Sequence, residues 1–110
     1  MTSLRGLGDA KTIDLVTEDV RTRECVLIIS AAGWEGSDEQ LSRLQEKLNA
    51  YLTFALDGEL LRRFPAAADK KIRIQIDFDR APSGLTADFL VQASKEISRL
   101  GMHLAANVLE

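Results

Sequence analysis

The stretch SDEQLSRLQEKLNAYLTFAL, residues 37–56, decides the fold of this chain. Its apolar residues recur at steps of three and four, which predicts one apolar stripe along an amphipathic α-helix. The stripe consists of Leu41, Leu44, Leu48, Tyr51, Leu52, Ala55 and Leu56. A helix of about 20 residues is roughly 30 Å long. We therefore expect it to cover one face of a sheet.

Both ends of this helix carry sequence signals. Ser37 opens an S-D-E-Q run typical of a capping box, in which the serine and glutamine side chains satisfy amides that the first turn leaves unpaired. Asp57 and Gly58 offer the left-handed position that commonly closes a helix. Residues 59–64 are then predicted to form a separate short helical turn. This turn must end before Pro65, because a proline cannot continue it.

Three segments before and after this helix have the patterns of β-strands. Alternation over residues 12–17 predicts a half-buried strand, and the apolar run 25–30 predicts a central one. The polar residues 18–23 would join them as an antiparallel hairpin. Residues 71–79 alternate most clearly, which indicates that one sheet face meets water. The apolar side of that strand consists of Ile72, Ile74, Ile76 and Phe78.

A second helix and a last strand complete the pattern. Pro82 breaks the chain, and Ser83 is predicted to cap a helix that runs through Leu100. Gly101 ends this helix, and the loose alternation of residues 102–108 predicts the last strand. The buried stripe of the helix is predicted to comprise Phe89, Leu90, Ala93, Ile97 and Leu100.

These elements predict an α+β two-layer sandwich with the order β-β-α-β-α-β. A four-stranded mixed sheet would carry both helices on one face, in a single domain of residues 12–108 behind a flexible N-terminal arm of residues 1–11. If both strand-helix-strand passages are right-handed crossovers on that face, the strand order is 1-2-3-4. The alternative is a short edge strand inserted between the others.

The overall composition narrows the class of protein. A chain of 110 residues with 45% hydrophobic content can close one domain-sized core. Its formal charge of −3 argues against a general affinity for nucleic acid. No apolar run reaches the roughly 18 residues of a membrane span, and Arg5 and Asp9 interrupt any secretory segment. We expect a cytoplasmic protein without nucleic-acid or membrane partners.

The connection between the second strand and the long helix is a candidate phosphate site. Gly33 and Gly36 bracket Trp34 just before a helix start, where bare amides attract anions. Glu35 and the acids that follow it would repel a phosphate, whereas they stabilise the positive end of the helix dipole. We therefore favour a structural turn, with Trp34 over the edge of the core.

Two carboxylates form the most tempting chemical group. Asp77 and Asp79 lie two apart on a predicted strand, so they would point the same way and could hold a divalent metal or share a proton. A catalytic pair needs burial to shift its pKa values, and these positions are predicted to be exposed. We favour a solvated strand end with a contact to Arg80. His103, the lone histidine, is predicted to be a solvated strand residue.

Two further features have ordinary structural interpretations. Cys25 lies in an apolar run and is predicted to be a small core residue. Residues 62–73 hold five cations and one acid, which could hold an acidic partner. Cations also collect after a helix C-terminus and at a strand start, and we favour that interpretation. The cations are Arg62, Arg63, Lys70, Lys71 and Arg73.

Two stretches resemble a known family. Ile13-Asp14-Leu15-Val16 and residues 44–52, LQEKLNAYL, are similar to sequences of a family of small bacterial proteins of unknown function. The resemblance extends over about residues 13–104. It implies the order hairpin, Leu-rich helix, strand, helix, strand. It implies no activity and no site.

Two classes of function remain open. The leading hypothesis is a non-enzymatic protein-binding or regulatory module that pairs with another protein or with itself, or with a cognate toxin if it is an immunity protein. We expect no catalytic residue, no metal site and no cofactor. The alternative is a small hydrolase or metal-dependent enzyme that uses Asp77, Asp79 and His103, and it requires a divalent ion near these carboxylates.

Overall fold

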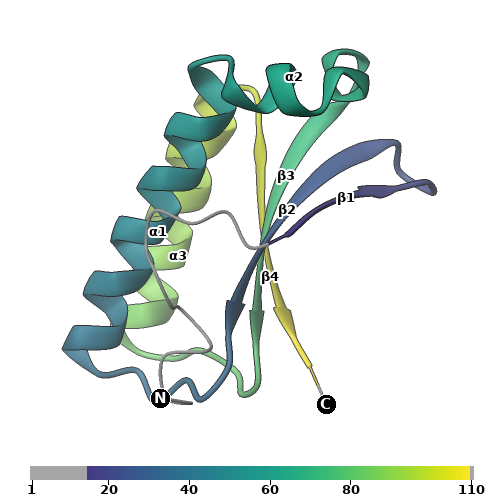
Figure 1. The fold of residues 1–110 in the computed structure, drawn as a ribbon. Helices are drawn as coiled ribbons and strands as arrows, with labels where there is room; N and C mark the ends of the chain where they lie inside the picture. Colours follow the sequence, from purple (N-terminus) through teal and green to yellow (C-terminus); the bar gives the residue numbers. More distant parts are fainter. Residues whose placement is uncertain (1–14, 110) are drawn as a thin grey trace.

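Four strands, two long helices and two short helical segments make up the part of the chain that the structure, a computed structural model, describes: residues 15–109 (Figure 1). The predicted arm, residues 1–11, and residues 12–14 of the predicted first strand lie outside the described residues. The elements are β1 Leu15–Asp19, β2 Glu24–Ala31, α1 Asp38–Leu56, α2 Glu59–Arg63, η2 Pro65–Asp69, β3 Lys71–Phe78, α3 Leu85–Arg99 and β4 His103–Val108.

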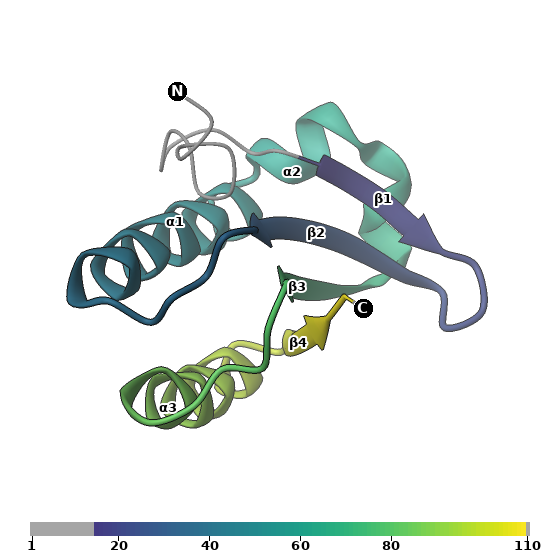
Figure 2. The same cartoon turned by 90° about the horizontal axis from the view of Figure 1, so that it is seen from below.

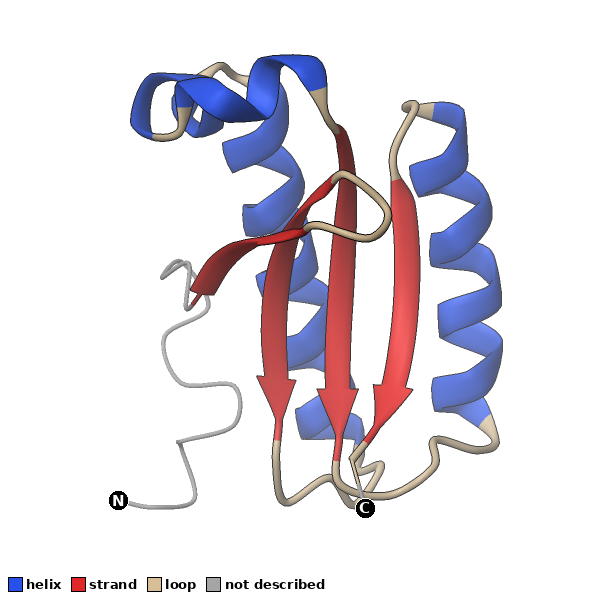
Figure 3. Ribbon diagram, turned by 90° about the vertical axis from the view of Figure 1, so that its right-hand side faces the viewer, coloured by secondary structure: helices blue, strands red, loops and turns tan. Residues whose placement is uncertain are grey.

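The strands form one mixed sheet in the order β1-β2-β3-β4. β1 is antiparallel to β2, whereas β2, β3 and β4 run parallel because α1 and α3 carry the chain back between them. Both long helices lie on the same face of the sheet (Figures 1 and 3). The fold is therefore the predicted two-layer α+β sandwich with the predicted strand order, and the alternative of an inserted edge strand is wrong.

The core lies between the sheet and the helices. The inward residues of β3, Ile74, Ile76 and Phe78, are fully buried, as the alternating pattern predicted. They meet apolar side chains from β2 and from the stripe of α1. The fully buried side chains among them are Leu27 and Ile29 of β2 and Leu44 and Tyr51 of α1.

Helix α1 begins and ends as its sequence predicts. Ser37 Oγ accepts a hydrogen bond from the Gln40 amide at 3.1 Å. Gln40 Oε1 in turn accepts from the amides of Glu35 and Gly36, at 2.7 and 2.9 Å, so its side chain reaches further back than a minimal capping box requires. Gly58, with φ 92°, provides the left-handed residue between α1 and α2.

Two polar residues lie on the buried side of α1, and one of them, Tyr51, ties the helix to the sheet. The Tyr51 hydroxyl donates to the Ile28 carbonyl of β2 at 2.9 Å. Lys47, one turn earlier, is also fully buried, and its Nζ lies 5.9 Å from the centroid of the Tyr51 ring. A lysine can occupy such a place because its long stem is apolar and its charge can lie over an aromatic face.

The start and the end of α3 differ from prediction. Gly84, with φ 58°, is the residue before the first turn, and no side chain caps the helix, so the prediction of a Ser83 cap is wrong. Leu100 was predicted to belong to the buried stripe and to the helix, which is wrong: it is 48% exposed, because it follows the last helical turn as the C-terminal cap.

The strand ends also shift. β1 continues to Asp19, two residues beyond the predicted end, because Asp19 pairs in register with Glu24 of β2. β3 stops at Phe78, so Asp79 follows the strand instead of ending it. The 3-10 helix η2 was not predicted, although its Pro65 correctly marked the end of the preceding turn.

Candidate functional site

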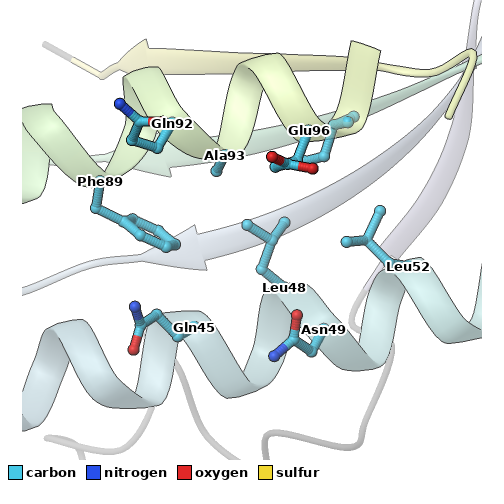
Figure 4. A pocket seen from close by; sticks show the side chains of 9 residues that line it. Gln45, Leu48, Asn49, Leu52, Phe89, Gln92, Ala93 and Glu96 are labelled. Atoms are coloured by element: carbon cyan, nitrogen blue, oxygen red, sulfur yellow. The ribbon is translucent and has the colours of Figure 1, made fainter. Parts of the chain in front are cut away.

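A groove separates the two long helices (Figure 4). α1 packs mainly on β2 and α3 mainly on β4, so the helices do not close on one another over the middle of the sheet. The groove has a volume of about 430 Å³. Its lining consists of Gln45, Leu48, Asn49, Leu52, Phe89, Gln92, Ala93, Glu96 and Ile97.

The floor of this groove is apolar and its rim is polar. Leu48 and Leu52 lie one turn apart on α1, and Phe89 and Ala93 lie one turn apart on α3, so each pair points to the same side of its helix. Figure 4 shows Leu48 and Phe89 projecting into the space between the helices. The rim is formed by the side chains of Gln45, Asn49, Gln92 and Glu96.

The lining of the groove is mainly apolar and carries little charge. Glu96 is the one ionisable residue in its lining, and its carboxylate accepts from Arg99 at 3.1 Å. From Phe89 to Ile97 the floor runs along nine residues of α3, a rise of about 12 Å, or roughly two helical turns. Apolar clefts with a few polar groups at the edge are typical of ligand and partner sites.

The predicted carboxylate pair is divided between two structural roles. Asp77 Oδ1 accepts from the Gln75 side chain at 2.8 Å and from the Asn107 side chain at 3.2 Å, on the open face of the sheet. Asp79 instead lies after β3 and binds backbone amides. The two carboxylates therefore do not share a ligand position in the structure.

Asp79 ties the Gly33–Gly36 turn to the end of β3. Its carboxylate accepts from the amides of Gly33 and Trp34, at 2.5 and 3.1 Å. These two bonds hold the pKa of Asp79 below its ordinary value, with the charge of Arg80 a smaller influence. The four amides of the turn that an anion would use are thus occupied by Asp79 and Gln40.

This bond to Asp79 also positions the tryptophan. Trp34 is 3% exposed, and its ring meets the Phe78 ring edge-on, with centroids 5.3 Å apart and an interplanar angle of 74°. The turn is therefore a structural lid over the end of the core, as the sequence interpretation favoured.

The lowered pKa of Asp79 predicts a pH dependence. Because the folded pKa lies below the unfolded one, Asp79 stabilises the fold above about pH 4 and loses this contribution as the pH falls through the folded value. We expect Asp79→Asn to melt at a lower temperature than the wild type at pH 7. The difference should shrink towards pH 2, as measured by circular dichroism. A difference that did not depend on pH would contradict the role of the charge.

A second polar cluster crosses the open face of the sheet. Arg73 of β3 donates to Asp19 of β1 at 3.0 Å and to Glu24 of β2 at 2.7 Å. The Arg73 side chain is only 16% exposed. Its hydrogen bond is the largest cause of the lowered pKa of Asp19. His103 Nδ1, on β4, lies 3.6 Å from Glu24, so histidine is brought to this cluster and not to Asp77 or Asp79.

The cations of residues 62–73 are largely balanced by neighbouring acids. Arg62 and Arg63 both bind Glu59 of the same short helix, and Lys70 lies 3.6 Å from Glu18. The structural interpretation of this stretch is therefore the better supported one. Cys25 is buried, and burial raises the pKa of its thiol, which fits a core residue.

Sequence reasoning missed the groove. It assigned Leu48 and Leu52 to the buried stripe of α1, and Phe89 and Ala93 to that of α3. All four do lie in the core or pack against it. The available signal was the amide side chains of Gln45, Asn49 and Gln92 beside these stripes. Whether the two helices close on each other or leave a groove depends on their spacing, and no local pattern records that spacing.

Two features are absent from the described residues. Within residues 15–109 no cluster of three or more His, Cys, Asp or Glu side chains is placed to hold a metal ion. None of the helices in this part of the chain is both long enough and apolar enough to cross a membrane.

Fold and groove together define a small two-layer α+β domain with an apolar cleft between its helices. Residues 6–110 match the model of a family described as Family of unknown function (DUF6572), and the chain belongs to this family. Comparisons with curated proteins and with solved structures gave no match.

Proposed function

We propose that the protein is a non-enzymatic binding module that accepts an amphipathic helix of a partner protein in the groove between α1 and α3. The observation that carries this proposal is the apolar floor with its rim of amide side chains. Partner proteins commonly lay the apolar face of a helix into such a groove.

The shape and polarity of the groove favour a helical occupant. The floor is about two turns long, and parallel walls of helix side chains suit the ridges of a third helix. Amides on both walls can donate and accept hydrogen bonds, so they can satisfy polar groups at the edge of a buried segment. No reacting group lines the floor, which supports binding over catalysis.

The test is a selection of peptides from a random 16-residue display library on the immobilised protein. We expect enriched peptides with apolar residues at i, i+3 or i+4, and i+7, which shift the amide resonances of the groove residues. Ala93→Arg fills the floor and should weaken their binding about tenfold or more, because a buried charge replaces apolar contact.

Two further variants make this result decisive. The double variant Asn49→Arg with Gln92→Arg changes exposed rim residues, so it should block the groove without lowering the melting temperature. Leu61→Arg, at an exposed leucine of α2 outside the groove, is the control and should bind as the wild type does. Peptides that bind all variants equally well, or an enriched set without helical spacing, would refute the proposal.

A further inference from the structure

A second apolar groove runs along the outer edge of β4. It lies between this strand and α3, on the side of α3 away from the groove described above, and has a volume of about 390 Å³. Both Figures 2 and 3 show α3 beyond β4, outside the row of strands. The lining consists of Leu90, Val91, Ser94, Lys95, Leu104 and Ala106.

The backbone of β4 is open along this groove. β4 is the last strand of the described sheet and pairs there with β3 alone. The Leu109 amide donates to the Phe78 carbonyl of β3 at 2.7 Å. Because backbone groups alternate in direction along a strand, those of Leu104, Ala106 and Val108 point to the open edge.

Two of the three side chains beside these groups are accessible, because Leu104 is buried whereas Ala106 and Val108 are exposed. Ala106 and Val108 stand in register with Ile76 and Phe78, on the face that the helices cover, yet both are exposed. Val91 of α3 is 54% exposed above them. An added strand would thus meet open hydrogen-bonding groups on one side and an apolar wall above.

We propose that this groove binds an extended segment of a partner protein, which adds to the sheet as a fifth strand beside β4. The occupant is a lone strand and not a second copy of this domain. If two copies paired their β4 edges about a two-fold axis, both α3 helices would lie over the line where the two sheets meet. The α3 of the first copy already extends over that position. Strand addition at an open sheet edge is a common mode of peptide recognition.

The charge of the groove narrows the chemistry of the segment. Lys95 is the one ionisable side chain in the described lining. α3 runs antiparallel to β4, which places Lys95 towards the Leu104 end of the groove. The favoured segment therefore alternates apolar and polar residues and carries an acidic residue that reaches Lys95.

The experiment selects 12-residue peptides that bind the immobilised full chain. Backbone methylation of the peptides then tests strand pairing, and variants of the protein test the role of charge. Selected peptides should shift the amide resonances of Leu104, Ala106 and Val108. The same peptides methylated on alternate backbone nitrogens should lose binding at least about tenfold, because methylation removes the donors that pair with β4. Equal binding of methylated and unmethylated peptides would overturn strand addition.

Two variants of the protein complete the test. Lys95→Glu should weaken acidic peptides about tenfold and favour the same peptides with lysine in place of the acid. Lys71→Glu, at an exposed lysine of β3, is the matched control and should change neither affinity. Ala106→Pro removes an outward amide, which an edge strand tolerates, and should abolish binding.

This inference does not depend on the helix-binding groove. Peptides that respond to Lys95→Glu and Ala106→Pro but not to the Asn49→Arg and Gln92→Arg pair would support strand addition alone, and the reverse would support the helix site alone. If no selected peptide responds to Lys95→Glu or to backbone methylation, the fifth-strand proposal is wrong, whether or not Ala106→Pro folds.

Discussion

Replacing Phe78 with alanine should lower the free energy of unfolding by about 3–5 kcal/mol, the usual cost of emptying a fully buried phenylalanine site. Phe78 is 0% exposed and lies where β3 ends against the Trp34 turn. The substitution removes the edge-on contact with Trp34 and leaves a void that the packed sheet and helix layers cannot readily close. Urea unfolding followed by circular dichroism measures the loss.

The chain offers controls of graded severity for this prediction. Phe64→Ala removes the same side chain at a site that is 41% exposed, and should cost under about 1 kcal/mol. Phe78→Leu keeps most of the buried volume and should cost about 1 kcal/mol, so it remains measurable if the alanine variant does not fold. Equal losses at positions 64 and 78 would mean that Phe78 is not a core residue.

Replacing Arg73 with methionine should have the second largest effect. Arg73 holds the carboxylates of Asp19 and Glu24 on neighbouring strands, and its own side chain is only 16% exposed. Methionine fills much of the same volume but leaves two carboxylates close together without their cation. Breaking a buried ion pair costs 3–5 kcal/mol, and partial exposure reduces this to about 2 kcal/mol here.

The pH dependence of this variant separates charge from packing. The pKa of Asp19 is lowered in the fold, first of all by the hydrogen bond from Arg73, so its contribution is present above about pH 4 and is lost as the pH falls through the folded value. The difference between wild type and Arg73→Met should therefore shrink below pH 4. Lys71→Met, at an exposed cation of the same strand, should stay within about 0.5 kcal/mol of the wild type.

The four strands and the two long helices were predictable because each has a characteristic local sequence pattern. The alternation of Ile72, Ile74 and Ile76 set both the strand and its buried side, and the Leu-rich stripe set the helix that covers it. The strand order also followed, because two crossovers on one face permit few arrangements of four strands. Apart from the 3-10 helix η2, which was not predicted, the errors in these elements lay at ends such as Ser83 and Asp79, where the last residue of an element depends on its neighbours in space.

The polar clusters show what local patterns leave out. Asp19, Glu24 and Arg73 meet on one sheet face although Arg73 is separated from the hairpin by the whole of α1. Asp77 and Asp79 lie two apart in sequence but bind different partners, because β3 ends between them at Phe78. Distance along the chain therefore predicted neither the Arg73 cluster nor the separation of the two aspartates. Asp77 and Asp79 were paired as candidates only because they lie two apart in the sequence.

The sequence alone determined the class of fold, the covered and open faces of the sheet, and the helix boundaries at Ser37 and Gly58, since these depend on periodicity and on backbone preferences of single residues. Only the tertiary structure decided that α1 and α3 stand apart and that α3 overhangs β4. Both proposed sites exist because of that displacement. It results from the packing of many side chains between the layers, and no single segment specifies it.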